Sequence, residues 1–292
     1  MAVRQLRVHL RRWGRAQAGR PALVLLHGWM DVGASWQFVV DALRSEREVV
    51  APDWRGFGLT QGPVTDHHVF DDYLADLDAL LEHLWPGAPV DIAGHSMGGN
   101  IAMLYAGARP GRVRRLVDLE GFGMPDVPAS EAAARHTQWL DELAAQRRGE
   151  NAMSDYDSRQ AVAQRLMRNN PRLPAGRATW LAGEWAAAHT RVDGTVRWRI
   201  RGDAAHRVVL PRIFRADEVL AHYRAIACPV LAVHAEDDSL QRRWQGRFRL
   251  ADFHRRLGSV ADHHIAAVGD AGHMLHHDQP EAVARLLEDF LG

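Results

Sequence analysis

Short apolar runs alternate with amphipathic segments over the first third of the chain. The runs at 22–26, 49–51 and 90–93 each lead into glycine, proline or a polar turn. Uninterrupted apolar runs of this length are typical of strands buried on both faces of a parallel sheet. Residues 69–85, between two of these runs, repeat apolar side chains at helical spacing. This alternation predicts a doubly wound α/β core.

The pattern changes over residues 124–215, where no clear buried strand is evident. Helical periodicity dominates this stretch, with several tryptophans and interrupting prolines, over 130–148, 158–169 and 177–189. The strand-and-helix rhythm resumes at Cys228. We therefore expect a core made of residues 1–123 and 216–292. The segment 124–215 is expected to be a helical cap, or lid, inserted between two core strands.

Charge and cysteine content narrow the class of protein. In 292 residues, 36 Lys and Arg balance 36 Asp and Glu. This balance provides no net field to attract nucleic acid or an acidic membrane. No apolar run is long enough to span a bilayer, and the basic N-terminal stretch lacks the apolar centre of a secretion signal. The single cysteine, Cys228, precedes an apolar strand and is expected to be buried. We expect a cytoplasmic protein.

The clearest chemical signal is Gly-His-Ser-Met-Gly at 94–98, which follows the apolar run 90–93 and precedes an alanine-rich helical segment. Glycines two positions before and after Ser96 permit a sharp strand-to-helix turn, where a Cβ would clash with the neighbouring element. Such a turn projects the hydroxyl above the sheet edge. It also places the Met97 N–H at a helix start, where it can stabilise negative charge. The sequence therefore predicts that Ser96 is a nucleophile.

A serine hydroxyl needs an adjacent base to act at neutral pH. His273 is the best candidate, because it follows the apolar run 265–268 and precedes the final helix at 281–291. Gly272 would let the loop return the imidazole over the sheet. The other adjacent histidine pairs are expected to be solvated, at 67–68, 263–264 and 276–277. No carboxylate or cysteine with ligand spacing accompanies 276–277, so no metal site is predicted.

The acid that orients the base is harder to assign. Asp237 directly follows the apolar run 230–233, so we assign it the role. Glu120 is a second candidate, because it follows the strand one step earlier in the chain. Asp238 is a third candidate.

Stabilising an oxyanion requires a second donor besides Met97. Trp29 lies in His-Gly-Trp after the first buried strand, and its backbone N–H is expected to point to the same spot. The glycines at 56, 58 and 62 have the wrong spacing for a dinucleotide loop, and no Gly-Lys-Ser/Thr ending is present. We therefore expect neither a dinucleotide-binding loop nor nucleotide hydrolysis.

Taken together, these segments resemble the α/β-hydrolase superfamily. The landmarks are residues 27–31, 52–58, 94–99 and 272–273. A narrower resemblance, to the serine hydrolase-like proteins, rests on residues 29–31, 34–36 and 203–206. The superfamily implies a cofactor-free hydrolase whose lid is the insertion, and it leaves the substrate open. Serine rather than aspartate at position 96 argues against epoxide hydrolase and haloalkane dehalogenase chemistry.

The expected function is a serine hydrolase that cleaves a small or medium-sized, largely apolar ester or related acyl compound through an acyl-enzyme. Two alternatives stay open. A carbon–carbon bond hydrolase would use the same three catalytic residues, and an arginine-containing pocket would favour it. A ligand-binding scaffold of the same fold would turn over slowly. The expected partner is a small-molecule acyl substrate, without nucleic acid, and both a monomer and a homodimer fit the sequence.

Overall fold

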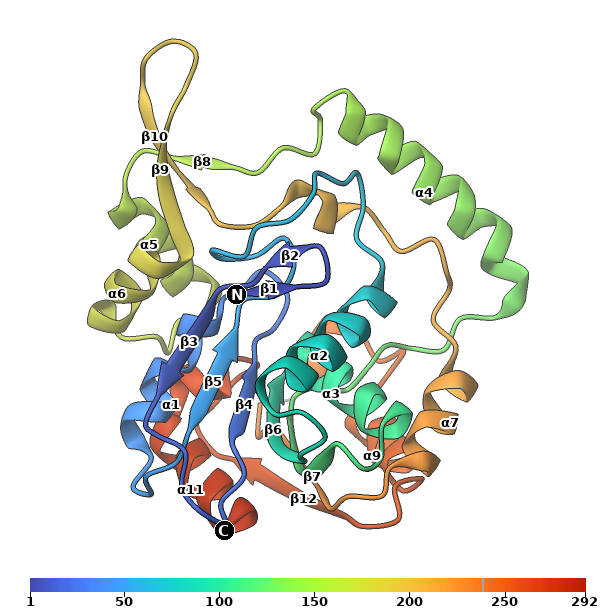
Figure 1. The fold of residues 1–292 in the computed structure, drawn as a ribbon. Helices are drawn as coiled ribbons and strands as arrows, with labels where there is room; N and C mark the ends of the chain where they lie inside the picture. The colour runs from blue at the N-terminus through green and yellow to red at the C-terminus, as the bar shows by residue number, and fades with distance from the viewer. Residues whose placement is uncertain (238) are drawn as a thin grey trace.

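A seven-stranded sheet forms the centre of the protein (Figure 1). The computed structural model describes residues 1–237 and 239–292. Strand order across the sheet is β12-β11-β7-β6-β4-β5-β3, and every neighbouring pair is parallel except β3 with β5. The strands are β3 Leu10–Trp13, β4 Leu23–Leu26, β5 Val49–Pro52, β6 Val90–His95, β7 Val113–Leu119, β11 Val230–Ala235 and β12 His263–Val268. The predicted α/β-hydrolase architecture, with its mostly parallel sheet, is confirmed.

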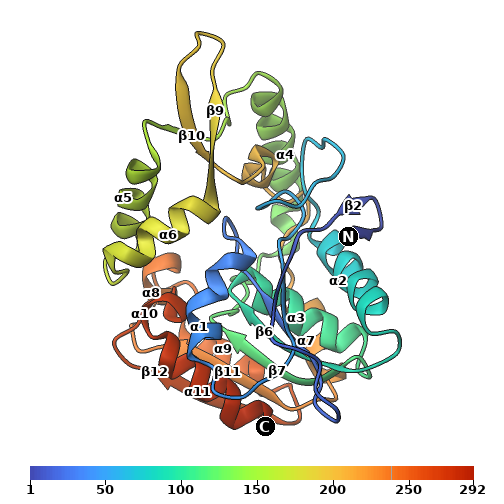
Figure 2. The same ribbon diagram turned by 60° about the vertical axis from the view of Figure 1, so that its left-hand side comes forward.

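Helices cover both faces of this sheet (Figures 1 and 2). One layer contains α1 Gln37–Ala42, α10 Leu275–Asp278 and α11 Pro280–Leu291. The other contains α2 Phe70–Leu84, α3 Met97–Ala108, α7 Ala216–Ala225 and α9 Leu250–Leu257. The short helix α8, Ser239–Trp244, follows β11. Among the described residues, no helix combines the length and apolar character needed to cross a membrane.

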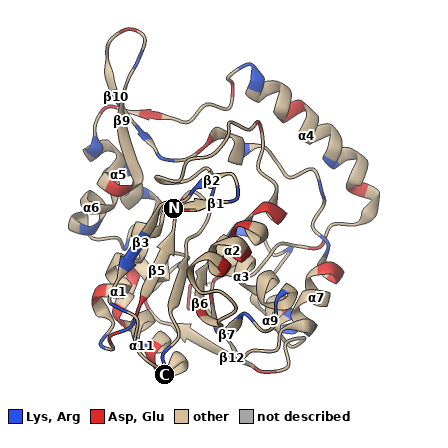
Figure 3. Ribbon diagram, in the orientation of Figure 1, with Lys and Arg blue, Asp and Glu red and all other residues tan. Residues whose placement is uncertain are grey.

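The apolar runs form strands because both of their faces are buried. All four residues of β4 are fully buried. Val24 and Leu26 pack into the core on the α2 and α3 side, whereas Leu23 and Leu25 pack into the core on the α1 and α11 side. Alternate side chains of a strand point to opposite faces, so an unbroken apolar run fills both cores. Basic and acidic residues are intermixed over the outer helices (Figure 3), in keeping with a formal net charge of +0.

The insertion, residues 124–215, lies between β7 and α7. Its helices are α4 Ala132–Arg147, α5 Arg159–Asn169 and α6 Ala175–Trp185, with short 3-10 turns at Ala129–Glu131 and Ala204–Arg207. It also contains an antiparallel sheet of order β8-β10-β9, made of Asp155–Tyr156, Val196–Ile200 and Ala186–Thr190. The sequence pattern did not indicate these strands, because they are short and mostly half-exposed. The N-terminus adds the small hairpin β1 Ala2–Val3 and β2 Leu6–Arg7.

The insertion packs on the loop that follows β4. Val32 and Ala34 of this loop share a buried apolar cluster with Val162, Leu181 and other residues of α5 and α6. Trp185, at the end of α6, also joins this cluster, and its indole N–H donates to the Met30 carbonyl at 2.7 Å. The insertion tryptophan is therefore both a packing residue and a polar tether to the core.

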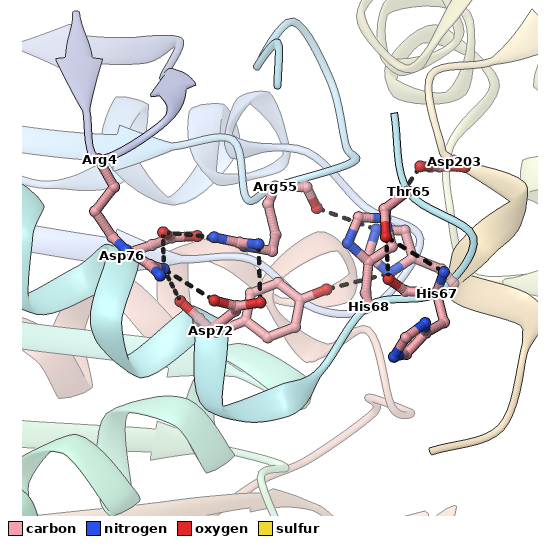
Figure 4. Close-up of polar contacts among 10 residues, drawn as sticks. Arg4, Arg55, Thr65, His67, His68, Asp72, Asp76 and Asp203 are labelled. Carbon is pink, nitrogen blue, oxygen red and sulfur yellow. Dashed lines mark hydrogen bonds and ion pairs between the residues drawn. The ribbon is translucent and has the colours of Figure 1, made fainter. Parts of the chain in front are cut away.

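A second tether joins the 3-10 turn at 204–207 to the core (Figure 4). The rings of His206 and His68 stack with centroids 3.8 Å apart. His206 donates from Nε2 to the Arg55 carbonyl at 3.0 Å, which leaves Nδ1 to accept from the Tyr73 hydroxyl at 3.1 Å. Asp203 accepts from the His68 Nε2–H at 3.1 Å. Residues 203–206, on which the similarity to the serine hydrolase-like proteins partly rests, thus contribute side chains that fasten the insertion to the core.

An ion-pair network lies beside this tether (Figure 4). Arg55 binds both carboxylate oxygens of Asp76, at 2.5 and 2.8 Å. Arg4 bonds the same carboxylate at 2.8 Å and also reaches Asp72 at 3.0 Å. A buried, bidentate arginine pair of this kind fixes geometry as well as charge. The Arg55 carbonyl is consequently held in place for His206.

Replacing Asp203 tests the second tether. Its carboxylate accepts from the Ala205 N–H at 2.9 Å and from His68. Asp203→Ala removes a helix cap and a charge-assisted hydrogen bond, so we expect a loss of about 2 kcal/mol in the free energy of unfolding. Urea titration followed by tryptophan fluorescence measures it. Asp289→Ala, at an exposed site on α11, is the control and should change stability by less than about 0.5 kcal/mol. An equal loss of stability in the two variants would contradict the role of Asp203 in fastening the insertion to the core.

Candidate active site

Ser96 occupies a sharp turn between β6 and α3. Its backbone φ of 52° and ψ of −112° are strained for a residue with a side chain. The flanking glycines make the turn possible by close approach. A Cβ on Gly94 would lie 2.4 Å from the Gly98 carbonyl oxygen, and one on Gly98 would lie 2.3 Å from the Leu26 carbonyl oxygen. The strand-turn-helix context predicted from 94–98 is therefore present.

His273 lies between Ser96 and a carboxylate. Its Nε2 is 3.1 Å from the Ser96 Oγ, and its Nδ1 is 3.0 Å from Oε2 of Glu120. A carboxylate only accepts hydrogen bonds, so Nδ1 carries the proton and Nε2 presents its lone pair to the hydroxyl. This tautomer is the one that takes a proton from serine. The structure brings these residues together from the ends of β6, β7 and β12.

Glu120 is held rigidly at the end of β7. Its backbone φ is 59°, and its side chain is 1% exposed. The Ala235 N–H donates to Oε1 at 2.7 Å, and the Ser239 hydroxyl donates to Oε2. With His273 added, the carboxylate has three donors: one from the end of β11, one from the start of α8 and one from the loop after β12. These contacts orient Glu120 toward the imidazole.

The assignment of Asp237 as the orienting acid is contradicted by the structure. Its side chain is 38% exposed, and Oδ2 accepts from Arg172 at 2.7 Å. β7 and β11 are adjacent parallel strands, so a carboxylate after either one lies at the same sheet edge. The backbone turn at Glu120 points that carboxylate at His273, whereas Asp237 turns outward to Arg172. Asp238, the third candidate, lies outside the described residues.

Trp29 and Met97 border the same cavity as Ser96. Met97 is the first residue of α3, where backbone N–H groups lack intrahelical acceptors. Trp29 follows Gly28, whose Cβ, if present, would lie 2.9 Å from the His95 ring and 3.4 Å from the Ser96 Cβ. The backbone at Gly28 therefore approaches the serine closely, while the Trp29 side chain is 53% exposed.

A cavity of about 1100 Å³ lies between the core and the insertion, above Ser96. Much of its wall is apolar, including Leu74, Met153, Leu181, Trp185 and Phe214. Its charged lining is dominated by arginines, which are Arg165, Arg207, Arg212, Arg215, Arg242 and Arg243. The acidic lining residues are Asp31, Asp71, Glu120 and Glu218. The site thus combines an apolar wall with an excess of positive charge.

The expectation that the paired histidines are solvated is wrong for three of them. His276 and His277 are fully buried, beside Asp31. Burial lowers the pKa of His277 to about 3, and the nearby His276 adds to this effect. His68 is buried against His206, whereas His264 is exposed. The contact with Asp31 could not be predicted from local sequence, because that residue lies near the other end of the chain.

Asp118 is a buried acid that sequence reasoning also missed. Its Oδ1 accepts from the Gly121 N–H at 3.0 Å, while Oδ2 has no partner among the described residues. Burial, together with the charge of Glu120, raises the pKa of Asp118 to about 7, although the Gly121 hydrogen bond opposes the shift. Near neutral pH, this carboxyl therefore exchanges a proton close to the site.

The raised pKa of Asp118 predicts a pH-dependent stability. The unfolded carboxyl has a pKa of about 3.9, so the folded state binds the extra proton between about pH 4 and 7. The free energy of unfolding must then fall as pH rises through this range. Asp118→Asn stays neutral, and its stability relative to wild type should grow by about 3 kcal/mol between pH 5 and 8. Denaturant titrations at both pH values measure this. A constant difference, as expected for Asp289→Asn, would show that Asp118 ionises normally.

A serine on a strand-to-helix turn at the carboxyl edge of a parallel sheet, facing a loop histidine, defines the class of α/β hydrolases. The chain belongs to this family, because the alpha/beta hydrolase fold family matches residues 21–280. The serine hydrolase-like protein of Danio rerio is 29% identical over 96% of this chain and 83% of its own length.

Two further matches extend the comparison. The 2-hydroxy-6-oxo-2,4-heptadienoate hydrolase of Pseudomonas putida is 38% identical over 37% of this chain, and the match covers 39% of that enzyme. The thioesterase domain from the curacin biosynthetic pathway has a TM-score of 0.80 at 23% identity, over 97% of this chain and 95% of that one. The superfamily resemblance inferred from the sequence is thus confirmed.

Proposed function

We propose that the protein is a serine hydrolase that cleaves a small or medium-sized, largely apolar ester or related acyl compound. The observation that carries this proposal is the continuous chain of contacts from Ser96 Oγ through His273 to Glu120. Membership of the α/β-hydrolase family and the partly apolar cavity above Ser96 support it. In this proposal Glu120 replaces Asp237 as the acid.

The reaction begins when Ser96 Oγ attacks the substrate carbonyl and its proton passes to His273 Nε2. The backbone N–H groups of Trp29 and Met97 stabilise the oxyanion that forms. When the intermediate collapses, His273 returns the proton to the leaving group. Water then attacks the acyl-enzyme, with His273 again accepting the proton. Collapse of this second intermediate breaks the bond to Ser96, releases the acid and returns the proton from His273 to Ser96 Oγ. Throughout, Glu120 holds the imidazole in its productive tautomer and stabilises its charged form.

The insertion acts as a cap in this proposal. It contributes the wall opposite Ser96, including Met153, Leu181 and Trp185. A wall of this kind excludes water from the acyl group and sets the shape that the substrate must fit. Substrate choice is therefore assigned mainly to residues 124–215, and the chemistry to the core.

The test compares Glu120→Gln with Asp237→Asn, using short-chain p-nitrophenyl esters. Glu120→Gln keeps the shape but favours the wrong His273 tautomer, so kcat should fall about 10⁴-fold. Asp237→Asn breaks only an exposed ion pair and should stay within a few-fold of wild type. Ser96→Ala provides the background rate. Collapse of Asp237→Asn with little effect in Glu120→Gln would reverse the assignment.

A fluorophosphonate probe separates the enzyme from the scaffold alternative. Such a probe forms a covalent bond only with an activated serine. Wild type should be labelled at Ser96, and Ser96→Ala should not be labelled. A folded wild-type protein that resists labelling would favour the ligand-binding scaffold.

A carbon–carbon bond hydrolase is the second candidate, favoured by one specific observation. Arg165 of α5 lines the cavity and has no acidic partner within the described chain. Its guanidinium lies over the rings of Tyr156 and Trp185, at 5.9 and 5.5 Å from their centroids. An arginine held on aromatic faces is well suited to bind a carboxylate. The Pseudomonas putida relative is named for a dienoate, which carries a carboxylate.

Arg165→Met distinguishes the two candidates. If the substrate carries a carboxylate, losing this partner should raise KM about 10- to 100-fold for substrates with that group. KM for neutral esters should not change. Arg168→Met, at an exposed position on the same helix, is the matched control. If Arg165→Met leaves KM at the wild-type value for carboxylate-bearing substrates as well as for neutral esters, the support for the carbon–carbon hydrolase is removed.

A further inference from the structure

Three potential metal ligands meet behind the proposed catalytic histidine. Asp31 comes from the loop after β4, and His276 and His277 come from α10. One ligand atom from each residue lies within 4.8 Å of those from the other two. Asp31 Oδ2 is 3.8 Å from His276 Nε2. The loop after β4 and helix α10 therefore place one carboxylate and two imidazoles together.

These groups are buried and lack the partners that buried polar atoms normally have. His276 is 0% exposed, His277 3% and Asp31 7%. Among the described residues, no hydrogen-bond partner is present for Asp31 Oδ2, either ring nitrogen of His276, or His277 Nε2. Nearly all buried polar atoms in proteins are hydrogen-bonded, so an unsatisfied group of this size requires a reason.

We propose that Asp31, His276 and His277 bind a divalent transition-metal ion of the Zn²⁺ class. Two imidazoles and one carboxylate are a donor set that zinc and its neighbours favour. The 3.8 Å between Asp31 and His276 is too long for a hydrogen bond. It is close to the spacing of about 3.3 Å expected between two ligands on one tetrahedral ion, so small side-chain rotations complete the site.

Neighbouring side chains hold the ligands in position. The Ser35 hydroxyl donates to Asp31 Oδ1, which leaves Oδ2 for the ion. The Trp36 ring packs on His276 with centroids 5.0 Å apart, and the Phe38 ring meets His277 edge-on. Contacts of this kind orient metal ligands and raise affinity. Because Asp31 and His277 also border the large cavity, an ion has a way in and a water molecule has room to complete the coordination.

The position of the site suggests a structural role. The His276 ring lies 4.3 Å from the His95 ring, and His95 donates from Nε2 to the His273 carbonyl at 2.7 Å. An ion here would join the loop of Trp29 to the segment that carries His273. It would not contact the reacting atoms, so the ligands are positioning residues.

The test measures metal binding directly. Protein stripped with a chelator is titrated with Zn²⁺ by calorimetry and with Co²⁺ by visible absorption. Wild type should bind one equivalent and show the visible bands of cobalt in a low-coordinate nitrogen and oxygen site. Asp31→Asn and His276→Gln should lose this binding, and Ser35→Ala should weaken it about 10- to 100-fold. His264→Gln, at an exposed histidine, should bind as wild type does.

Circular dichroism and thermal melting without metal establish that each variant is folded. If His276→Gln does not fold, the nearly isosteric Asp31→Asn decides the question. Failure of the wild type to bind Zn²⁺ or Co²⁺ would overturn the proposal, as would binding by a folded Asp31→Asn equal to that of wild type. None of these measurements uses turnover, so the result is independent of the proposed hydrolase function.

Discussion

The close contact between β6 and α3 is the constraint on which the rest of the site depends. At Gly94, β6 approaches α3 so closely that no side chain fits between them, and at Gly98 the helix approaches the end of β4 equally closely. This contact bends the chain at Ser96, lifts the hydroxyl off the sheet edge and starts α3 directly beneath it. The strain of the turn is offset by the buried cores on both sheet faces, where β4 and β6 are packed. With the serine fixed, the loops after β7 and β12 need only bring Glu120 and His273 to one point.

The sequence allowed most of the core to be predicted, because buried parallel strands leave an unmistakable apolar pattern. The positions of Ser96 and His273 could also be predicted, since each residue lies in a local sequence pattern that contains turn-forming glycine. The acid could not be predicted, because Glu120 and Asp237 both follow apolar strands that are neighbours in the sheet. Choosing between them requires the direction of a side chain, which depends on a backbone turn with φ of 59° at Glu120.

The buried histidines illustrate a different limit. The adjacent histidines at 276 and 277 are polar, and polar residues in a short segment before a helix are usually solvated. Their burial follows from long-range packing, in which Trp36 and Asp31 from the loop after β4 cover them. Spacing rules for metal ligands detect donors that lie close in sequence, and here the carboxylate comes from a distant loop. The strands β8, β9 and β10 could not be predicted either, because short, half-exposed strands have few apolar residues in a regular pattern.

The hydrogen bond between Trp185 and Met30 links movement of the insertion to the geometry of the proposed site. The Trp185 indole binds the carbonyl of Met30, the residue next to Trp29. Movement of the insertion away from the core must break this bond and release the backbone beside the proposed oxyanion donor. Opening the cavity and dismantling the site would then be a single event. In the proposed hydrolase, the oxyanion donors would therefore be in place only while the insertion is closed on the core.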